Sequence, residues 1–396
     1  MSEQPLMRGF PPAPEHQVTI ANWRTPPFNR WAFSHVRQIL PTAPIARAGA
    51  PVLPLRRAER ALGRLAFQGP DGRERTIDRM LDETFTDGFL VMQRGRILAE
   101  WYDGSLTPST PHIIFSVSKS VTGTLSGVLV EEGRLDPEAA VTRYIPEAAG
   151  SAYGDCTVRH VLDMTVSTDF VEDYLDPHGD FARYRVATGW NPVDPAKATD
   201  LHSFLVTMRR GKAPHGQNYH YVSPNSDLMG WILERAGGRA YAELLSEALW
   251  QPMGAEFEAY TAVDRLGAAR PAGGICVTLR DLARFGEMMR NRGMANGRQV
   301  IPGWWVEDIR NNGDSGPWQR AEASKLAPKG RYRSKWYVLG NDRGSFCGIG
   351  IHGQWVYVDP AAELVIAKLS SQPEPVDDPT DFLLLAAFDA IAKAVM

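Results

Sequence analysis

The pattern of apolar and polar positions predicts strands near both ends of the chain. Residues 89–93 and 97–102 are apolar runs separated by Arg94-Gly95-Arg96, which is typical of a β-hairpin with a glycine turn. Strand-like runs return in the last third, before a terminal apolar helix expected over residues 382–394. The four late runs are 336–339, 346–351, 354–358 and 364–369.

Residues 136–265 have a mainly helical pattern instead. Strands at both ends and helices between them predict an α+β fold, with a mainly antiparallel sheet, flanking helices and an all-helical subdomain. We expect residues 1–135 and 266–396 to form the α/β subdomain, including an N-terminal arm. Residues 173–195 are rich in Asp, Pro, Gly and aromatic residues, and a long loop of this composition inside the helical insertion indicates a lid.

Composition narrows the possible classes of function. The formal net charge is -3, which gives no field to attract nucleic acid or a membrane surface. Cys156, Cys276 and Cys347 are few and far apart, which argues against a disulfide framework or a zinc site. No phosphate loop or dinucleotide fingerprint occurs, and neither a signal peptide nor an apolar run of about 18 residues is found. We expect a soluble cytoplasmic protein without metal or cofactor.

The first candidate for chemistry is the run Phe115-Ser116-Val117-Ser118-Lys119-Ser120, at the start of a helix-length apolar segment. Positions i and i+3 share one helix face, so the Ser116 hydroxyl and the Lys119 amine can meet. A lysine whose pKa is lowered by burial can take the proton of a serine hydroxyl. Because Ser-x-x-Lys is common by chance, the spacing alone fits a surface lysine on an ordinary helix equally well.

Two later elements offer partners for this pair. Tyr221 precedes turn residues and a helix, and a phenol there can relay a proton; taken alone, it is also an ordinary core or surface tyrosine. Residues 348–353 read Gly-Ile-Gly-Ile-His-Gly on an expected strand, where glycine allows close approach to the backbone. An exposed N–H at this edge could join that of Ser116 in an oxyanion hole; the alternative is a bend or bulge in the sheet.

In this order, the three elements resemble the penicillin-recognising serine hydrolases, which include class C β-lactamases, D-alanyl-D-alanine carboxypeptidases and related esterases. The finer motifs are similar to the 6-aminohexanoate-dimer hydrolases, which cleave linear nylon oligomers and small carboxyl esters. This resemblance covers most of the chain. The motifs that carry it are residues 22–37, 115–120, 172–177, 189–190, 221–230 and 350–355.

The resemblance implies a role for each residue that matches a family motif. Ser116 would be the acylated nucleophile, Lys119 its base and Tyr221 the proton relay. The backbone N–H groups of Ser116 and Ile351 would form the oxyanion hole. The family is also dimeric, so a homodimer is expected.

Three further residues are expected to bind substrate. Tyr174 would hydrogen-bond the scissile amide nitrogen, and Trp190 would close over the substrate. His352 is next to the oxyanion strand and could touch substrate, or be held by local hydrogen bonds instead. The carboxylates of the loop, Glu172, Asp173 and Asp176, are interpreted as solvated charges; the alternative is that one of them attracts an amino terminus of the substrate.

One departure from the wider family bears on the substrate. The β-lactam-recognising members carry Lys-Thr-Gly where this chain has Gly348-Ile349-Gly350, so the lysine that captures the substrate carboxylate is absent. We therefore expect a serine hydrolase that cleaves amides or esters of small carboxylic acids through an acyl-enzyme. Two alternatives stay open: a β-lactamase or D-alanyl-D-alanine carboxypeptidase, and a non-catalytic binding homologue of the same fold.

Overall fold

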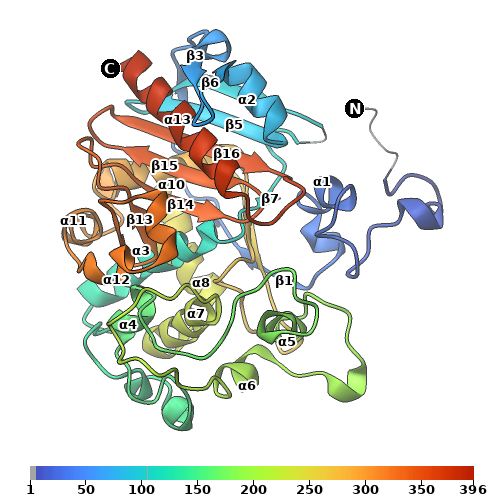
Figure 1. Cartoon of the computed structure of the whole chain (residues 1–396), viewed down its shortest axis with the longest axis vertical. Helices are drawn as coiled ribbons and strands as arrows, with labels where there is room; N and C mark the ends of the chain where they lie inside the picture. The colour runs from blue at the N-terminus through green and yellow to red at the C-terminus, as the bar shows by residue number, and fades with distance from the viewer. Residues whose placement is uncertain (1–5, 105) are drawn as a thin grey trace.

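The computed structural model describes residues 6–104 and 106–396 (Figure 1). Its main element is an eight-stranded sheet of strand order β12-β13-β14-β15-β16-β5-β6-β2. All neighbours in this sheet pair antiparallel except β2, which runs parallel to β6. The strands are β2 (Arg56–Arg57), β5 (Thr86–Gln93), β6 (Arg96–Tyr102), β12 (Arg331–Arg333), β13 (Trp336–Val338), β14 (Phe346–Gly350), β15 (Gln354–Asp359) and β16 (Leu364–Ser370).

The predicted hairpin and late strands are present in this sheet. β5 and β6 pair around the Arg94-Gly95 turn, with a register shift between Val91 and Met92. β16, from the end of the chain, pairs with β5 from its beginning. The sheet is thus built from both ends of the chain, and the segment between β6 and β12 is inserted between its two parts.

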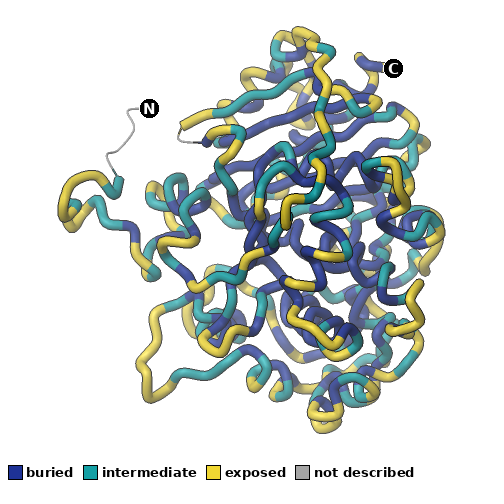
Figure 2. Tube along the Cα trace, turned by 180° about the vertical axis from the view of Figure 1, so that it is seen from behind, coloured by how far each residue is buried: buried dark blue, intermediate teal, exposed yellow. Residues whose placement is uncertain are grey.

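Helices cover both faces of the sheet, and alternate residues of each strand supply the two cores. Val356 and Val365 face one core together with α10 (Leu279–Arg290), whereas Tyr357 and Ile366 face the other together with α13 (Asp378–Val395). The short helix α2 (Ile77–Glu83) lies on the same side as α13 (Figure 1). The strands between them are therefore buried on both faces, as Figure 2 shows.

Helix α3 (Val117–Glu131) lies between the sheet and the helical region. It packs on β14 on one side and on α7 (Pro224–Gly237) on the other. Three of its buried hydroxyl groups are satisfied within the helix: Thr122, Thr124 and Ser126 each donate to the carbonyl four residues earlier. The remaining α-helices are α1 (Phe28–Ala32), α4 (Val158–Leu162), α5 (Asp180–Ala187), α6 (Leu201–Leu205), α8 (Tyr241–Leu245), α9 (Gln251–Met253), α11 (Gly303–Asn311) and α12 (Gly316–Gln319).

A close approach to the backbone at Gly123 fixes the position of α3. A Cβ atom at Gly123 would lie 2.0 Å from the carbonyl oxygen of Ser334. We expect Gly123→Ala to lower the free energy of unfolding by about 2 kcal/mol, because the added methyl group would clash with the Ser334 carbonyl and force α3 and the Ser334 backbone apart. Gly150→Ala is the matched control, since a Cβ there would meet nothing within 4 Å. Chemical denaturation measures both, and equal stability of the two variants would contradict this packing.

A second sheet, of order β1-β8-β9-β7, leads the chain into α3. Its strands are β1 (Thr42–Ile45), β7 (His112–Ile113), β8 (Ala259–Ala262) and β9 (Ile275–Val277). The N-terminal arm packs beside it: Trp23 is fully buried, and its ring stacks on Phe115 at 6.3 Å. The arm therefore forms one wall next to the start of α3. Two further hairpins are β3 (Ala66–Gln68) with β4 (Glu74–Thr76), and β10 (Met294–Ala295) with β11 (Arg298–Gln299).

The segment expected to be a lid-like loop, residues 173–195, differs from the prediction. It contains helix α5 (Asp180–Ala187), which buries Phe181 and Tyr184. These two residues are three apart and so share one helix face. The helix has only 8 residues and is flanked by Asp, Pro and Gly. The sequence pattern therefore did not indicate it.

Among the residues that the structure describes, no helix is both long and apolar enough to span a membrane.

Candidate active site

Ser116 and Lys119 meet at the start of α3, as the i, i+3 spacing predicted. Lys119 Nζ donates a hydrogen bond of 2.7 Å to Ser116 Oγ and a second one of 2.7 Å to the carbonyl oxygen of Ala272. Ser116 is 8% exposed and Lys119 only 1%. Phe115, just before the pair, has a φ of 39°, a strained conformation of the kind found at functional sites. The turn into the helix thus presents the serine hydroxyl to a buried amine.

Burial decides the protonation of Lys119. Loss of water around the amine lowers the pKa of Lys119 from 10.5 to about 8. The nearby carboxylates of Glu172 and Asp227 oppose this change, and the Arg270 cation adds to it. A substantial fraction of Lys119 is therefore neutral close to physiological pH, and a neutral amine can accept a proton.

Tyr221 also lies at this site. Lys119 Nζ is 4.9 Å from the centroid of the Tyr221 ring. Burial raises the pKa of Tyr221 well above its usual value, with Tyr337 and Tyr174 adding to the shift. The free protein therefore holds Tyr221 as a neutral phenol, which can donate a proton. The prediction that Tyr221 accompanies the Ser116–Lys119 pair is consistent with this placement.

The end of β14 lies against the backbone that leads into α3. A Cβ atom at Gly350 would be 2.6 Å from the carbonyl oxygen of Ile114 and 3.0 Å from the Ser116 nitrogen. Only glycine permits this approach. It places Ile351, the next residue, near the Ser116 backbone. The Gly-rich stretch in the sequence therefore marks a close contact between two backbones.

Glu172 is held in a hydrogen-bond network, so its interpretation as a solvated loop charge is wrong. The half-buried carboxylate accepts hydrogen bonds from the Tyr174 hydroxyl at 2.7 Å, from the Ser223 hydroxyl at 2.6 Å and from the Ser223 N–H. Asp173 and Asp176 are exposed, as expected, and accept from backbone N–H groups of their own loop. The partner Ser223 is 51 residues from Glu172, and no local pattern in the sequence signals such a contact.

Sequence reasoning also missed the buried ion pair of Asp227 and Arg270, which is connected to Lys119 through Ala272. Asp227, on α7, accepts a hydrogen bond of 2.8 Å from the Ala272 N–H and lies 3.3 Å from Arg270 Nε. It also accepts from the Tyr184 hydroxyl of α5. Because the Ala272 carbonyl binds Lys119, Asp227 fixes the segment that orients the base. Asp227 lies inside the Tyr221 motif, but nothing in that motif indicates its partners.

Trp190 and His352 belong to the aromatic cluster that joins the arm to Phe115. Trp190 is 5% exposed, and its ring lies 6.2 Å from that of Phe115. His352 is 3% exposed, and its Nδ1 is hydrogen-bonded to the carbonyl oxygen of Gln372 at 2.7 Å. Burial lowers the pKa of His352 to about 4, so it is neutral. A local hydrogen bond thus holds His352, as the alternative interpretation expected. Both rings pack against Phe115, the residue before Ser116.

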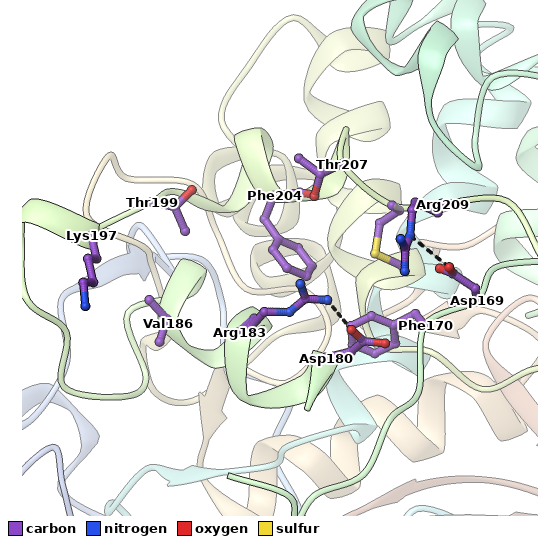
Figure 3. Close-up of a pocket in the computed structure, with 11 residues that line it drawn as sticks. Asp169, Phe170, Asp180, Arg183, Val186, Lys197, Thr199, Phe204, Thr207 and Arg209 are labelled. Carbon is purple, nitrogen blue, oxygen red and sulfur yellow. Dashed lines mark hydrogen bonds and ion pairs between the residues drawn. The ribbon is translucent and has the colours of Figure 1, made fainter. Parts of the chain in front are cut away.

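A pocket elsewhere in the helical region does not include Ser116, Lys119 or Tyr221 (Figure 3). The Tyr184 ring separates it from Asp227, because Tyr184 packs against Phe170 and Phe204 of the pocket wall. Its charges are largely paired, Arg183 with Asp180 and Arg209 with Asp169. The lining residues are Asp169, Phe170, Asp180, Arg183, Val186, Lys197, Thr199, Phe204, Thr207, Met208 and Arg209.

Known proteins resemble this chain over most of its length. The model of the family described as Beta-lactamase matches residues 74–390. A 6-aminohexanoate-dimer hydrolase from Paenarthrobacter ureafaciens is 40% identical over 366 residues, which cover 92% of this chain and 91% of that protein.

Solved structures show the same relationship. A Bacillus anthracis protein, described as an inferred 6-aminohexanoate-dimer hydrolase, has a TM-score of 0.85 and 27% identity, covering 97% of this chain and 98% of that one. A family VIII carboxylesterase has a TM-score of 0.56 at 16% identity, covering 78% of this chain and 96% of that one, which is a likeness in fold.

The chain belongs to the beta-lactamase family of serine hydrolases, whose members act on amides and esters. Within that family, it is similar along nearly its whole length to 6-aminohexanoate-dimer hydrolase. The family resemblance, the α+β fold and the prediction of a hydrolase are confirmed.

Proposed function

We propose that the protein hydrolyses amides or esters of small carboxylic acids through an acyl-enzyme on Ser116. The observation that carries this proposal is the 2.7 Å hydrogen bond between Ser116 Oγ and a buried lysine. A serine hydroxyl is a weak nucleophile until a base takes its proton. Lys119 is such a base, because burial lowers its pKa to about 8.

In the first half-reaction, neutral Lys119 takes the proton of Ser116 while Oγ attacks the carbonyl carbon. The N–H groups of Ser116 and Ile351 stabilise the developing oxyanion. Protonated Lys119 then supplies the proton, through the Tyr221 hydroxyl, that the departing amine or alcohol accepts as its bond to carbon breaks. The products are an ester on Ser116 and the free leaving group, with Lys119 neutral again.

In the second half-reaction, water replaces the alcohol or amine. Tyr221 and Lys119 take one proton from the water as its oxygen attacks the acyl carbon. The tetrahedral intermediate collapses, the bond to Ser116 Oγ breaks, and Oγ recovers the proton. A carboxylic acid leaves, and the enzyme returns to its first state.

The relatives support 6-aminohexanoate-dimer-like amides and short-chain carboxyl esters as substrates. In this proposal, Tyr174 hydrogen-bonds the scissile amide nitrogen. Its hydroxyl is directed to Glu172 in the free protein, and the phenolic oxygen keeps a lone pair that accepts from a substrate N–H. Trp190 and His352 line the same side of the site through the Phe115 cluster. A homodimer and a cytoplasmic location remain predictions, and light scattering tests the first.

A substrate panel tests the proposed function. Purified protein is assayed with 6-aminohexanoate dimer, p-nitrophenyl butyrate and nitrocefin. We expect ester turnover, measurable cleavage of the amide and little hydrolysis of nitrocefin. Nitrocefin hydrolysis at a rate similar to that of the ester would favour a β-lactamase, and no turnover of any compound would favour a non-catalytic homologue.

The activity should depend on pH through Lys119. Since the base must be neutral, kcat/KM for a neutral ester rises about tenfold per pH unit below the pKa of about 8 and levels off above it. Glu172 raises the pKa of Lys119, so Glu172→Gln should move the midpoint of the profile to lower pH. Stopped-flow assays between pH 6 and 10 measure both midpoints. A profile that is flat over this range, or a midpoint that rises in Glu172→Gln, would contradict the role of Lys119.

A further inference from the structure

Three arginines contact Trp190 through side chain or backbone, on the side of the site formed by the arm and α5. Arg24, from the arm, donates a hydrogen bond of 2.8 Å to the Trp190 carbonyl. Arg185, on α5, accepts one of 2.9 Å from the Trp190 N–H through its own carbonyl. The guanidinium carbon of Arg270 lies 4.5 Å from the centroid of the Trp190 ring. Arg24 and Arg270 thus bring cations to one aromatic side chain from distant segments, and the Arg185 guanidinium donates a hydrogen bond of 3.1 Å to the carbonyl oxygen of Tyr174 beside the same site.

This cluster borders the nucleophile. Trp190 packs on Phe115, the residue before Ser116. A Cβ atom at Gly273 would be 3.6 Å from Trp190 and 3.7 Å from the Phe115 backbone, and the preceding residue, Ala272, holds Lys119. The arginine cluster therefore lies next to Trp190 and Phe115, which border the Ser116 hydroxyl.

Carboxylates balance the positive charge of the cluster only in part: Asp227 pairs with Arg270, and burial lowers the pKa of Arg185 while Glu172 raises it. Among the described residues, only Arg270 has a carboxylate within 4.0 Å, that of Asp227. Arg24 and Arg185 donate to neutral oxygens instead, which include the carbonyl oxygens of Trp190 and Tyr174. Burial lowers the pKa of Arg24 well below its usual value, and Arg185 and Arg270 lower it further. The cations thus repel one another in the free protein.

Buried donors in the cluster also lack an acceptor. Arg270 is 3% exposed, and its Nη1 has no hydrogen-bond partner among the described residues. The same is true of the Trp190 indole Nε1. Buried polar groups are normally paired, and a guanidinium binds a carboxylate with two parallel hydrogen bonds. Unpaired donors and incompletely balanced cations together indicate a site for an anion.

We propose that Arg24, Arg185 and Arg270 form a subsite for a substrate carboxylate, so that the preferred substrates are small amides or esters that carry a second, free carboxylate. This inference rests on the proposed hydrolysis at Ser116 and specifies its substrate class. The subsite disfavours a substrate with an ammonium group in the same place, because that group would meet three cations.

Three six-carbon acids test the subsite as competitive inhibitors of p-nitrophenyl acetate hydrolysis. Adipate, hexanoate and 6-aminohexanoate share one carboxylate and differ in the far end, which is a carboxylate, a methyl group or an ammonium group. We expect adipate to bind at least about tenfold more tightly than hexanoate, and 6-aminohexanoate more weakly than hexanoate. The preference for adipate should fall as salt is added.

Two substitutions on α5 provide a matched comparison. Arg185→Gln should reduce the preference for adipate over hexanoate by about fivefold or more. Arg183→Gln removes the same charge from the same helix at an exposed position paired with Asp180 and should keep the preference. Arg24→Gln, on a different element, repeats the test should Arg185→Gln fold poorly.

The outcomes separate this inference from the proposed function. If adipate binds no better than hexanoate, if 6-aminohexanoate binds best, or if Arg183→Gln and Arg185→Gln change the preference equally, the subsite is wrong while ester hydrolysis stands. If hydrolysis of p-nitrophenyl acetate does not depend on Ser116, the proposed function itself fails.

Discussion

Ser116→Ala is expected to lower kcat for a p-nitrophenyl ester by at least about 10⁴-fold. The hydroxyl is the atom that carries the acyl group, and the other hydroxyl groups of α3 are not placed to replace it. Thr122, Thr124 and Ser126 donate to carbonyls of their own helix. Ser120 donates to the Lys335 carbonyl, and Ser118 accepts from the Ile275 N–H. Steady-state assays with freshly purified variant measure the loss.

Ser126→Ala is the matched control for this variant. It removes the same kind of atom from the same helix, where the hydroxyl donates a hydrogen bond of 2.9 Å to the Thr122 carbonyl. It should keep kcat within about twofold, since surrounding groups are unchanged. Retention of wild-type kcat in Ser116→Ala would exclude Ser116 as the nucleophile.

Lys119→Met is expected to lower kcat/KM by about 10³-fold or more, the contribution of a well-placed general base. Lys119 Nζ lies at hydrogen-bond distance from Ser116 Oγ, and the methionine side chain fills the same space without a basic atom. The rise in activity near pH 8 should disappear as well. Thermal stability should be kept or increased, because the substitution removes a buried, desolvated amine.

Lys368→Met separates this effect from the loss of any buried lysine. Lys368 is fully buried in β16, where it donates to the Thr84 carbonyl and to Ser370. Its removal should leave the pH profile of kcat/KM unchanged. A similar loss of kcat/KM in both variants would show that Lys119 acts through the fold, and not as the base.

The sequence predicted those parts of the site that depend on local geometry. The i, i+3 spacing of Ser116 and Lys119 on one helix face determines their contact once the helix forms. The glycines at 348 and 350 indicated a backbone approach on a strand, and Gly350 makes it. The hairpin and the late strands followed from alternating or continuous apolar runs of strand length.

The supporting network could not be predicted, because its contacts join distant segments. Glu172 binds Ser223 across 51 residues, and Asp227 holds Ala272 across 45. Each carboxylate lies in a polar stretch that fits a solvated surface equally well, so the pattern does not indicate which ones are buried. Helix α5 was missed for a related reason: the partners of its buried aromatic rings lie outside the helix, Tyr174 for Phe181, and Phe170 and Phe204 for Tyr184.

The central claim is that hydrolysis proceeds through an acyl group on Ser116. Labelling with a fluorophosphonate, followed by intact-mass measurement and peptide mapping, tests it most directly. One adduct per chain is expected, on the peptide that contains Ser116, with much slower labelling in Lys119→Met and none in Ser116→Ala. An adduct on another residue, or labelling that persists in Ser116→Ala, would contradict it.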